Sequence, residues 1–263
     1  NPNCLNGIRI AKEWERKYRC MQRYFIYFCY DGTAYHGWQI QPNGMSVQET
    51  LQNALSTILR QRVEIVGAGR TDTGVHARMM VAHLDLAEEI ECEQLTYKLN
   101  RLLPRDISVF NIQPVDSNMH ARFSAKWRTY RYFIHTRKDP FLRNYSYESP
   151  YPLDFELMEQ GAELLKQHQD FAAFCKSGAD NTTTLCTIQE SKWVKISPYS
   201  WYFEITANRF LRNMVRATVG TLILLGRHRI TIKDLERILE EGNRSQAGES
   251  MPGHALFLEN IEY

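Results

Sequence analysis

The chain has 263 residues, of which 43% are hydrophobic and 24% are charged, as in ordinary globular proteins. This composition excludes a disordered or collagen-like chain, and a net charge of +2 excludes a chain that is basic throughout. The longest aliphatic run, 222–225, is far shorter than the roughly 18 apolar residues of a membrane span, so no membrane association is expected.

Residues 1–20 hold several charged side chains and lack the apolar segment of a secretory signal. Met21 is a candidate initiator, so we expect residues 1–20 to be an N-terminal extension. The six cysteines are scattered and form no C-x-x-C pair, which favours free reduced thiols over a disulfide framework. This pattern predicts a cytoplasmic protein.

The first half of the remaining chain predicts the order β-α-β-β-α-β. Apolar residues at helical spacing follow a capping box at Ser46 and Glu49, and a second apolar helical pattern ends before Pro104. The helices are expected at 47–59 and 95–103. Aromatic and β-branched runs predict the strands, at 24–30, 63–68, 79–86 and 107–112.

The second half predicts a similar order with one extra helix. Asp154 and Thr231 are candidate caps for helices over 154–169 and 231–241, and a further helix is expected at 209–225. Strands are expected at 128–135, 187–196, 201–206 and 255–262. We therefore predict an α+β protein of two similar split β-α-β lobes, 21–114 and 115–263, with a mainly antiparallel sheet and a basic cleft between the lobes.

Charge is unevenly distributed along the chain. Residues 119–145 contain seven basic residues and one acid, residues 207–229 contain five basic residues and no acid, and an acidic run spans 85–93. Such polarisation suits a basic cleft that attracts a polyanion, although ordinary surface patterning explains it equally well. Aromatic residues interleave the first basic segment, as expected where RNA bases stack, or where a strand faces the core.

The most informative segment is the loop G-A-G-R-T-D-T-G-V-H-A at 67–77. It matches neither the dinucleotide fingerprint nor the phosphate-binding loop, because Asp72 occupies the third glycine position and no G-K-[ST] occurs. Its glycines allow a sharp bend and the close approach of a substrate. Taken alone, the loop is explained more simply by Asp72 as a turn former.

Several segments in register resemble the TruA family of tRNA pseudouridine synthases. The G-R-T-D-x-G-V-H-A pattern is similar to the family signature, and the resemblance extends over roughly residues 24–263. The other matching segments are Y-D-G-T-x-Y-x-G-W-Q at 30–39, S-V-Q-E-x-L at 46–51, H-A-R-F-S-A at 120–125, Y-R-Y at 130–132, and N-x-F-L-x-x-M-V-R-x-x-V-G at 208–220. Departures from the pattern are Thr73, and His254 with Ala255 where a glycine is frequent.

The resemblance implies a tRNA pseudouridine synthase acting on uridines of the anticodon stem-loop, at tRNA positions 38–40, as a homodimer without a cofactor or metal. In the family pattern Asp72 is the nucleophile, Arg70 helps displace the target base, Tyr130 stacks on the flipped uracil, and Arg216 pairs with the nucleophile. Together with Tyr130, the residues expected to contact RNA are Arg122, Arg128, His120, Arg209 and Arg212.

The residue types suit this chemistry. Pseudouridine forms when uracil leaves the ribose through N1 and rejoins it through C5, so nothing is added or lost. A carboxylate is needed as nucleophile, and a paired arginine keeps it ionised and fixes its direction. Attack at uracil C6 and at ribose C1′ are both open, and the Tyr130 hydroxyl is one candidate for accepting the C5 proton.

Two other functions compete with this hypothesis. A metal hydrolase would use Asp72, His76, His83 and Asp85 as ligands, although their spacing matches no zinc signature. A non-catalytic RNA-binding module would account for the basic and aromatic residues equally well. It would not require a carboxylate between arginines in a site that binds phosphates.

Overall fold

The computed structural model describes residues 21–176, 178 and 182–263. The extension predicted for residues 1–20 therefore lies outside the described residues, as do Cys4 and Cys20. The helices are α2 (Val47–Leu59), α3 (Cys92–Leu102), α4 (Phe155–Leu165), α5 (Met214–Gly226) and α6 (Ile232–Glu241). The strands are β1 (Gln22–Tyr30), β2 (Val66–Gly67), β3 (His76–Leu86), β4 (Ile107–Val115), β5 (Trp127–His135), β6 (Tyr147–Glu148), β7 (Ile188–Ser197), β8 (Ser200–Ala207) and β9 (Leu256–Glu262).

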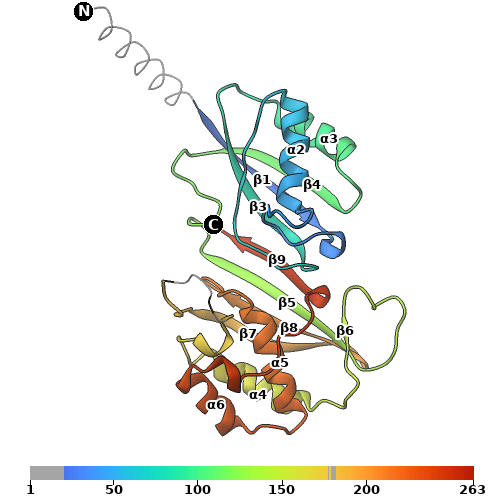
Figure 1. Ribbon diagram of the computed structural model, residues 1–263, viewed down its shortest axis with the longest axis vertical. Coiled ribbons are helices and arrows are strands. Elements are labelled where there is room, and N and C mark those ends of the chain that lie inside the picture. Colours follow the sequence, from blue (N-terminus) through green and yellow to red (C-terminus); the bar gives the residue numbers. More distant parts are fainter. Residues whose placement is uncertain (1–20, 177, 179–181) are drawn as a thin grey trace, which may run out of the picture.

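Within the described residues, nine strands form one sheet whose main path is β4-β1-β3-β9-β5-β8-β7 (Figure 1). Strand β2 pairs with β3, and β6 pairs with β5. The pairs are antiparallel except β3 with β9 and β5 with β6. The prediction of a mixed α+β protein with a mainly antiparallel sheet is therefore confirmed.

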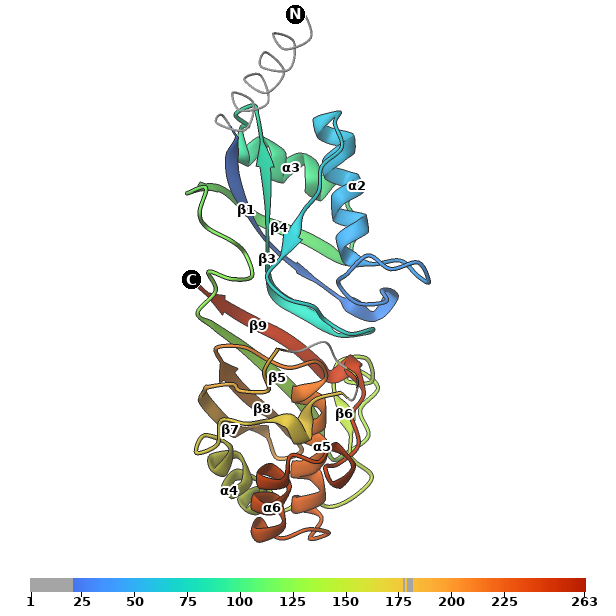
Figure 2. The same cartoon turned by 60° about the vertical axis from the view of Figure 1, so that its left-hand side comes forward.

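Helices cover each half of the sheet, as Figures 1 and 2 show. Helices α2 and α3 lie with β1, β3 and β4, and α2 buries the stripe that includes Val47, Leu51 and Leu55. Helices α4, α5 and α6 lie with β5, β7 and β8. Most of α5 is buried on every side, as expected of a helix packed between other elements rather than at the surface.

The predicted helix over 209–225 begins five residues late. Asn213 adopts the left-handed conformation, with φ of 67°, and this breaks the helical path before Met214. Arg209 and Arg212 therefore lie in the segment between β8 and α5 rather than on the helix. The strand predicted over 63–68 is reduced to β2, and β6 was not predicted.

The two halves of the sheet join at the parallel pair β3 and β9, where His76 pairs with Phe257. The His76 ring is buried, its Nε2 donates to His254 O at 2.8 Å, and its Nδ1 accepts from Gly32 N at 2.9 Å. Burial lowers the pKa of His76, although the His254 backbone and the nearby Asp31 carboxylate oppose this shift. The end of the 67–77 loop is therefore fixed at the junction.

Candidate active site

The loop that carries Asp72 packs against the preceding loop, 31–45. Thr71 O accepts from Trp38 N at 3.2 Å, and the Thr71 hydroxyl lies 2.8 Å from the Tyr30 hydroxyl. Gly37 has φ of 86°, and a Cβ atom there would lie 2.3 Å from Thr71 O. Only glycine allows this approach without displacing backbone, so the sequence of one loop determines the path of the other.

Asp72 pairs with Arg216 from the other half of the sheet. Arg216 lies in the first turn of α5, and its Nη1 donates to Asp72 Oδ2 at 2.9 Å. Its Nε donates to Met251 O, which fixes the plane of the guanidinium. The Asp72 side chain is 33% exposed, so the carboxylate is oriented by a charged partner and still open to a substrate. Residues 144 positions apart are brought together as predicted.

Tyr130 lies on β5 and is only 9% exposed. Its ring meets Phe210 edge-on, with centroids 4.9 Å apart. Burial raises the pKa of Tyr130 to about 12, Arg128 opposes this shift, and the nearby charge of Asp72 adds to it. The hydroxyl is therefore protonated at neutral pH and lies close enough to Asp72 to sense its charge.

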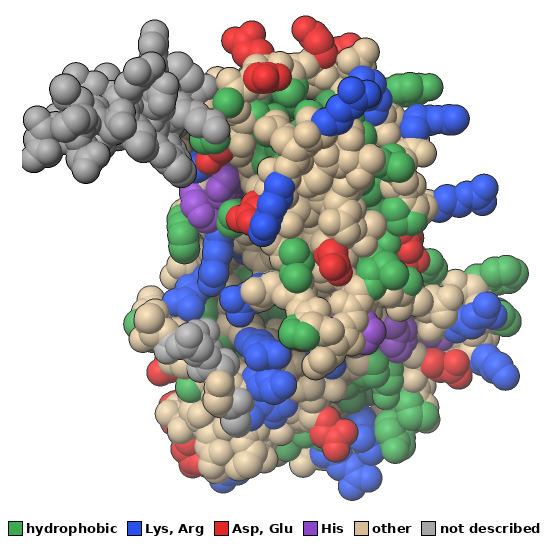
Figure 3. Space-filling view, turned by 45° about the horizontal axis from the view of Figure 1, so that its top comes forward, with side chains coloured by type: hydrophobic (Ala, Val, Ile, Leu, Met, Phe, Trp, Pro, Cys, Tyr) green, Lys and Arg blue, Asp and Glu red, His purple; other side chains and the backbone are tan. Residues whose placement is uncertain are grey.

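The other predicted RNA contacts occupy different surroundings. Arg70, Arg122 and Arg212 are exposed, and Arg209 is half-buried. Among the described residues, no hydrogen bond or ion pair involves the guanidinium of Arg70, which is therefore available to a substrate. Figure 3 shows Lys and Arg side chains gathered in a strip on one face of the molecule.

Arg128 is bonded to the protein's own backbone. Its two Nη atoms donate to the carbonyl oxygens of Ala68, Arg122, Ala125 and Asn208, at 3.1, 2.6, 3.4 and 2.9 Å respectively. Burial lowers its pKa, although Tyr130 and Tyr263 oppose this shift. Arg128 thus ties the loop of Asp72 to two other loops. The sequence held no signal of this role, because backbone acceptors can belong to any residue.

One ring nitrogen of His120 is bonded to the backbone. Its Nδ1 accepts from Arg122 N at 3.1 Å and from Phe123 N at 3.3 Å. The ring lies between those of His83 and Phe123, at centroid distances of 4.5 and 4.4 Å. Direct contact of His120 with RNA stays a prediction, and the geometry gives the ring a supporting position instead.

His83 supports the same turn and makes stability pH-dependent. Its Nδ1 accepts from Ala121 N at 3.1 Å, and burial, with smaller contributions from nearby Arg23 and His120, lowers its pKa to about 4. An unfolded histidine titrates near about pH 6.5. The unfolded chain therefore binds protons more readily between these values, and stability present above about pH 6.5 is lost as the pH falls.

From His83 we expect the free energy of unfolding to fall by about 2 kcal/mol between pH 7 and pH 5. His76 acts in the same direction because its pKa is also lowered. Urea titrations at the two pH values measure the difference. The variant His83→Asn keeps an acceptor for Ala121 N and should show a smaller fall, whereas an equal fall in the variant would refute this assignment.

The residues of the competing metal hydrolase hypothesis do not form a ligand cluster. Over the described parts of the chain, no group of three or more His, Cys, Asp or Glu side chains is arranged to hold a metal ion. Both nitrogens of His76 are used by backbone groups, and Asp85 forms two bonds with Arg23, at 2.8 and 2.7 Å.

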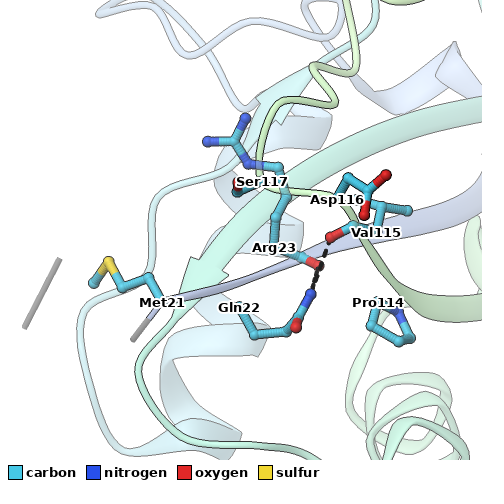
Figure 4. A pocket seen from close by; sticks show the side chains of 7 residues that line it. All are labelled: Met21, Gln22, Arg23, Pro114, Val115, Asp116 and Ser117. Carbon is cyan, nitrogen blue, oxygen red and sulfur yellow. Dashed lines mark hydrogen bonds between the residues drawn. The ribbon is translucent and has the colours of Figure 1, made fainter. Parts of the chain in front are cut away.

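Figure 4 shows a pocket at the start of β1, whose other end, at Tyr30, contacts Thr71 of the Asp72 loop. It is lined by Met21, by the first two residues of β1 and by the last two residues of β4 with the two residues after them, and none of the predicted site residues lines it. A hydrogen bond of 3.0 Å from Gln22 Nε2 to Val115 O connects its two walls.

In the described part of the chain, no helix combines the length and the apolar character needed to cross a membrane.

The chain matches a known protein family over most of its length. The family model described as tRNA pseudouridine synthase matches residues 27–124 and 162–263. The chain belongs to this family. The matched residues include Asp72 and Arg216, so both partners of the ion pair lie within the family's own sequence. The TruA resemblance is confirmed, and with it the enzyme class, an isomerase that forms pseudouridine in tRNA.

Individual relatives agree along nearly the whole chain. The tRNA pseudouridine synthase A of Bacteroides fragilis is 52% identical over 244 residues, which cover 92% of this chain and 97% of the relative. The enzyme of the same name from Porphyromonas gingivalis is 50% identical, with 92% and 98% covered. That of a Thermoanaerobacter species is 42% identical, with 92% and 100% covered.

Proposed function

We propose that this chain isomerises uridine to pseudouridine in the anticodon stem-loop of tRNA, at positions 38–40, and that Asp72 is its nucleophile. The observation that carries the proposal is the ion pair of Asp72 with Arg216, at 2.9 Å, on segments that match the family. The relatives are named tRNA pseudouridine synthase A, which supports tRNA as the substrate.

The two carboxylate oxygens of Asp72 have different surroundings. Oδ2 accepts from Arg216, whereas none of the hydrogen bonds found among the described residues uses Oδ1. One oxygen is therefore held and the other is free to attack, at ribose C1′ or at uracil C6. In either case the N1–C1′ bond breaks, a C5–C1′ bond forms, the C5 proton leaves, and N1 gains a proton.

Tyr130 has a defined part in this proposal. The target uridine must leave its stack, which costs a few kcal/mol, and an aromatic ring recovers part of that cost by stacking, about 1–3 kcal/mol per base. A hydroxyl with a pKa of about 12 is protonated at neutral pH. The Tyr130 ring is proposed as the contact with uracil, and its hydroxyl stays one candidate for accepting the C5 proton.

The tRNA is proposed to lie across the junction of the two sheet halves, on the face where Lys and Arg side chains gather (Figure 3). The junction brings the Asp72 loop of one half to α5 of the other. A basic cleft between two lobes, a homodimer and a cytoplasmic location stay predictions. Sedimentation of the purified chain tests the homodimer.

The reaction itself is tested with tRNA transcripts labelled with tritium at uridine C5. Formation of the C5–C1′ bond expels the label, so the wild-type chain should release tritium into water in proportion to the tRNA consumed. A chain that binds the transcript without releasing tritium would refute the isomerase and support an RNA-binding module.

Arg122 and Arg128 should differ in their effect on tRNA binding. The exposed guanidinium of Arg122 is placed to meet a phosphate, so Arg122→Ala should lower the slope of log affinity against log salt by about 0.7–0.9. Arg128 is occupied by four carbonyl groups, so Arg128→Ala should leave that slope unchanged and lower the melting temperature. Titrations at several salt concentrations measure both. A reduced slope in Arg128→Ala would restore its predicted phosphate contact.

A further inference from the structure

We propose that Phe123 is a stacking site for an unpaired base of the tRNA, separate from the site that holds the reacting uridine. The inference rests on the proposed function, which supplies RNA as the ligand. The Phe123 ring is 76% exposed, although most large apolar side chains among the described residues are buried. Aromatic rings are the groups on which unpaired RNA bases stack, and an exposed ring held in place by the fold suits that contact.

The ring is supported from behind. Its centroid lies 4.4 Å from that of His120, which lies 4.5 Å from that of His83. His83 is in turn 5% exposed and lies next to Phe25 in the core, at 6.4 Å. The rings of His83, His120 and Phe123 therefore run from the core to the surface, and the last is largely exposed.

Phe123 lies in the turn formed by residues 119–124. Hydrogen bonds within this turn, and others from four separate parts of the fold, fix its position. Within it, Ser124 N donates to His120 O at 3.0 Å, and His120 N donates to Ser124 Oγ at 2.9 Å. The bonds to the rest of the fold come from side chains of β1, β3, β5 and the last residue of the chain. They join Arg23 to Met119 O, His83 to Ala121 N, Arg128 to Arg122 O, and Tyr263 to Ala121 O.

The fixed position of the turn lowers the entropy cost of binding a base. A ring already fixed in place loses little conformational entropy when a base stacks on it. The guanidinium of Arg128 donates both to Arg122 O and to Ala68 O, and Ala68 lies four residues before Asp72. The stacking site is therefore held in a fixed relation to the candidate nucleophile.

Charge identifies the occupant as a nucleotide rather than an apolar peptide. The Arg122 guanidinium lies 5.7 Å from the Phe123 ring centroid, and the exposed Lys126 follows in the chain. A nucleotide carries an apolar base face and a phosphate side by side, and this pair of groups matches both. The base must be unpaired or terminal, because neighbouring bases cover both faces inside a helix.

Binding of an unmodified tRNA transcript to three variants tests the proposal. Phe123→Ala and Phe123→Leu should weaken affinity by about 5- to 150-fold, because neither offers an aromatic face, whereas Phe123→Trp should stay close to wild type. The salt dependence should be the same in all of them, since no charge is removed. Phe141→Ala is the matched control, because Phe141 is 90% exposed and among the described residues has no ring against it.

A second measurement locates the contact directly. Ultraviolet irradiation of the complex should cross-link RNA to the peptide containing Phe123, and Phe141 should not react. Unchanged affinity of Phe123→Ala would overturn the proposal, and so would full affinity of Phe123→Leu. A change of oligomeric state in Phe123→Ala without tRNA would also overturn it, by assigning the ring to a protein contact. These binding results do not depend on turnover, so they can be told apart from failure of the isomerase proposal.

Discussion

The variant Asp72→Asn should form no measurable pseudouridine, with turnover reduced on the order of 10⁴-fold or more. The amide has nearly the shape of the carboxylate but no anionic oxygen with which to attack. The side chain is partly exposed and contacts Arg216 through one oxygen only, so the fold should be retained. Affinity for tRNA should stay close to wild type, and tritium release with parallel binding titrations measures both.

The control for this variant is Asp116→Asn. Asp116 is an exposed carboxylate at the pocket of Figure 4, away from the site, and its neutralisation changes the net charge equally. It should release tritium at the wild-type rate. Normal turnover in Asp72→Asn would show that Asp72 is not the nucleophile, whatever the control does.

The variant Arg216→Gln should lower turnover by about 10²- to 10³-fold. It removes the charged donor that directs Asp72 Oδ2 and loosens the contact with Met251 O. Arg216→Lys keeps the charge but lacks the geometry to bond both groups at once, so its activity should be intermediate. Initial rates at saturating tRNA, with melting temperatures for each variant, test this order.

A double variant separates positioning from any independent role. If Arg216 acts through Asp72, then Asp72→Asn with Arg216→Gln should be no slower than Asp72→Asn alone. A further loss in the double variant would mean that Arg216 also contacts the substrate. Equal rates for Arg216→Gln and the wild type would remove the ion pair from the mechanism.

Local sequence signals predicted the starts of helices well where a capping side chain bonds to the neighbouring backbone. The helix after Ser46 and the helix capped by Thr231 begin where the caps are, because a side chain accepts from the backbone three residues on. The predicted start of α5, at residue 209, was wrong. A single residue, Asn213, adopts a left-handed conformation there, and nothing in its neighbours signals it.

Local sequence patterns did not predict which distant segments pair with each other. The parallel pair of β3 with β9 involves Ala77 and Leu258, which are far apart in sequence and have no pattern that marks them as partners. The pairing of Asp72 with Arg216 was available only through the family resemblance. Arg128 shows the limit most clearly, because an arginine in a basic segment looks the same whether it binds phosphates or carbonyl groups.

The most direct test of the account is to map pseudouridine at single-nucleotide resolution in an unmodified tRNA transcript, by carbodiimide-dependent stops of reverse transcription. After incubation with the wild-type chain, stops should appear at positions 38–40, and after incubation with Asp72→Asn they should be absent. No stops with the wild-type chain, stops confined to another region of the tRNA, or stops that persist with Asp72→Asn would each contradict the account.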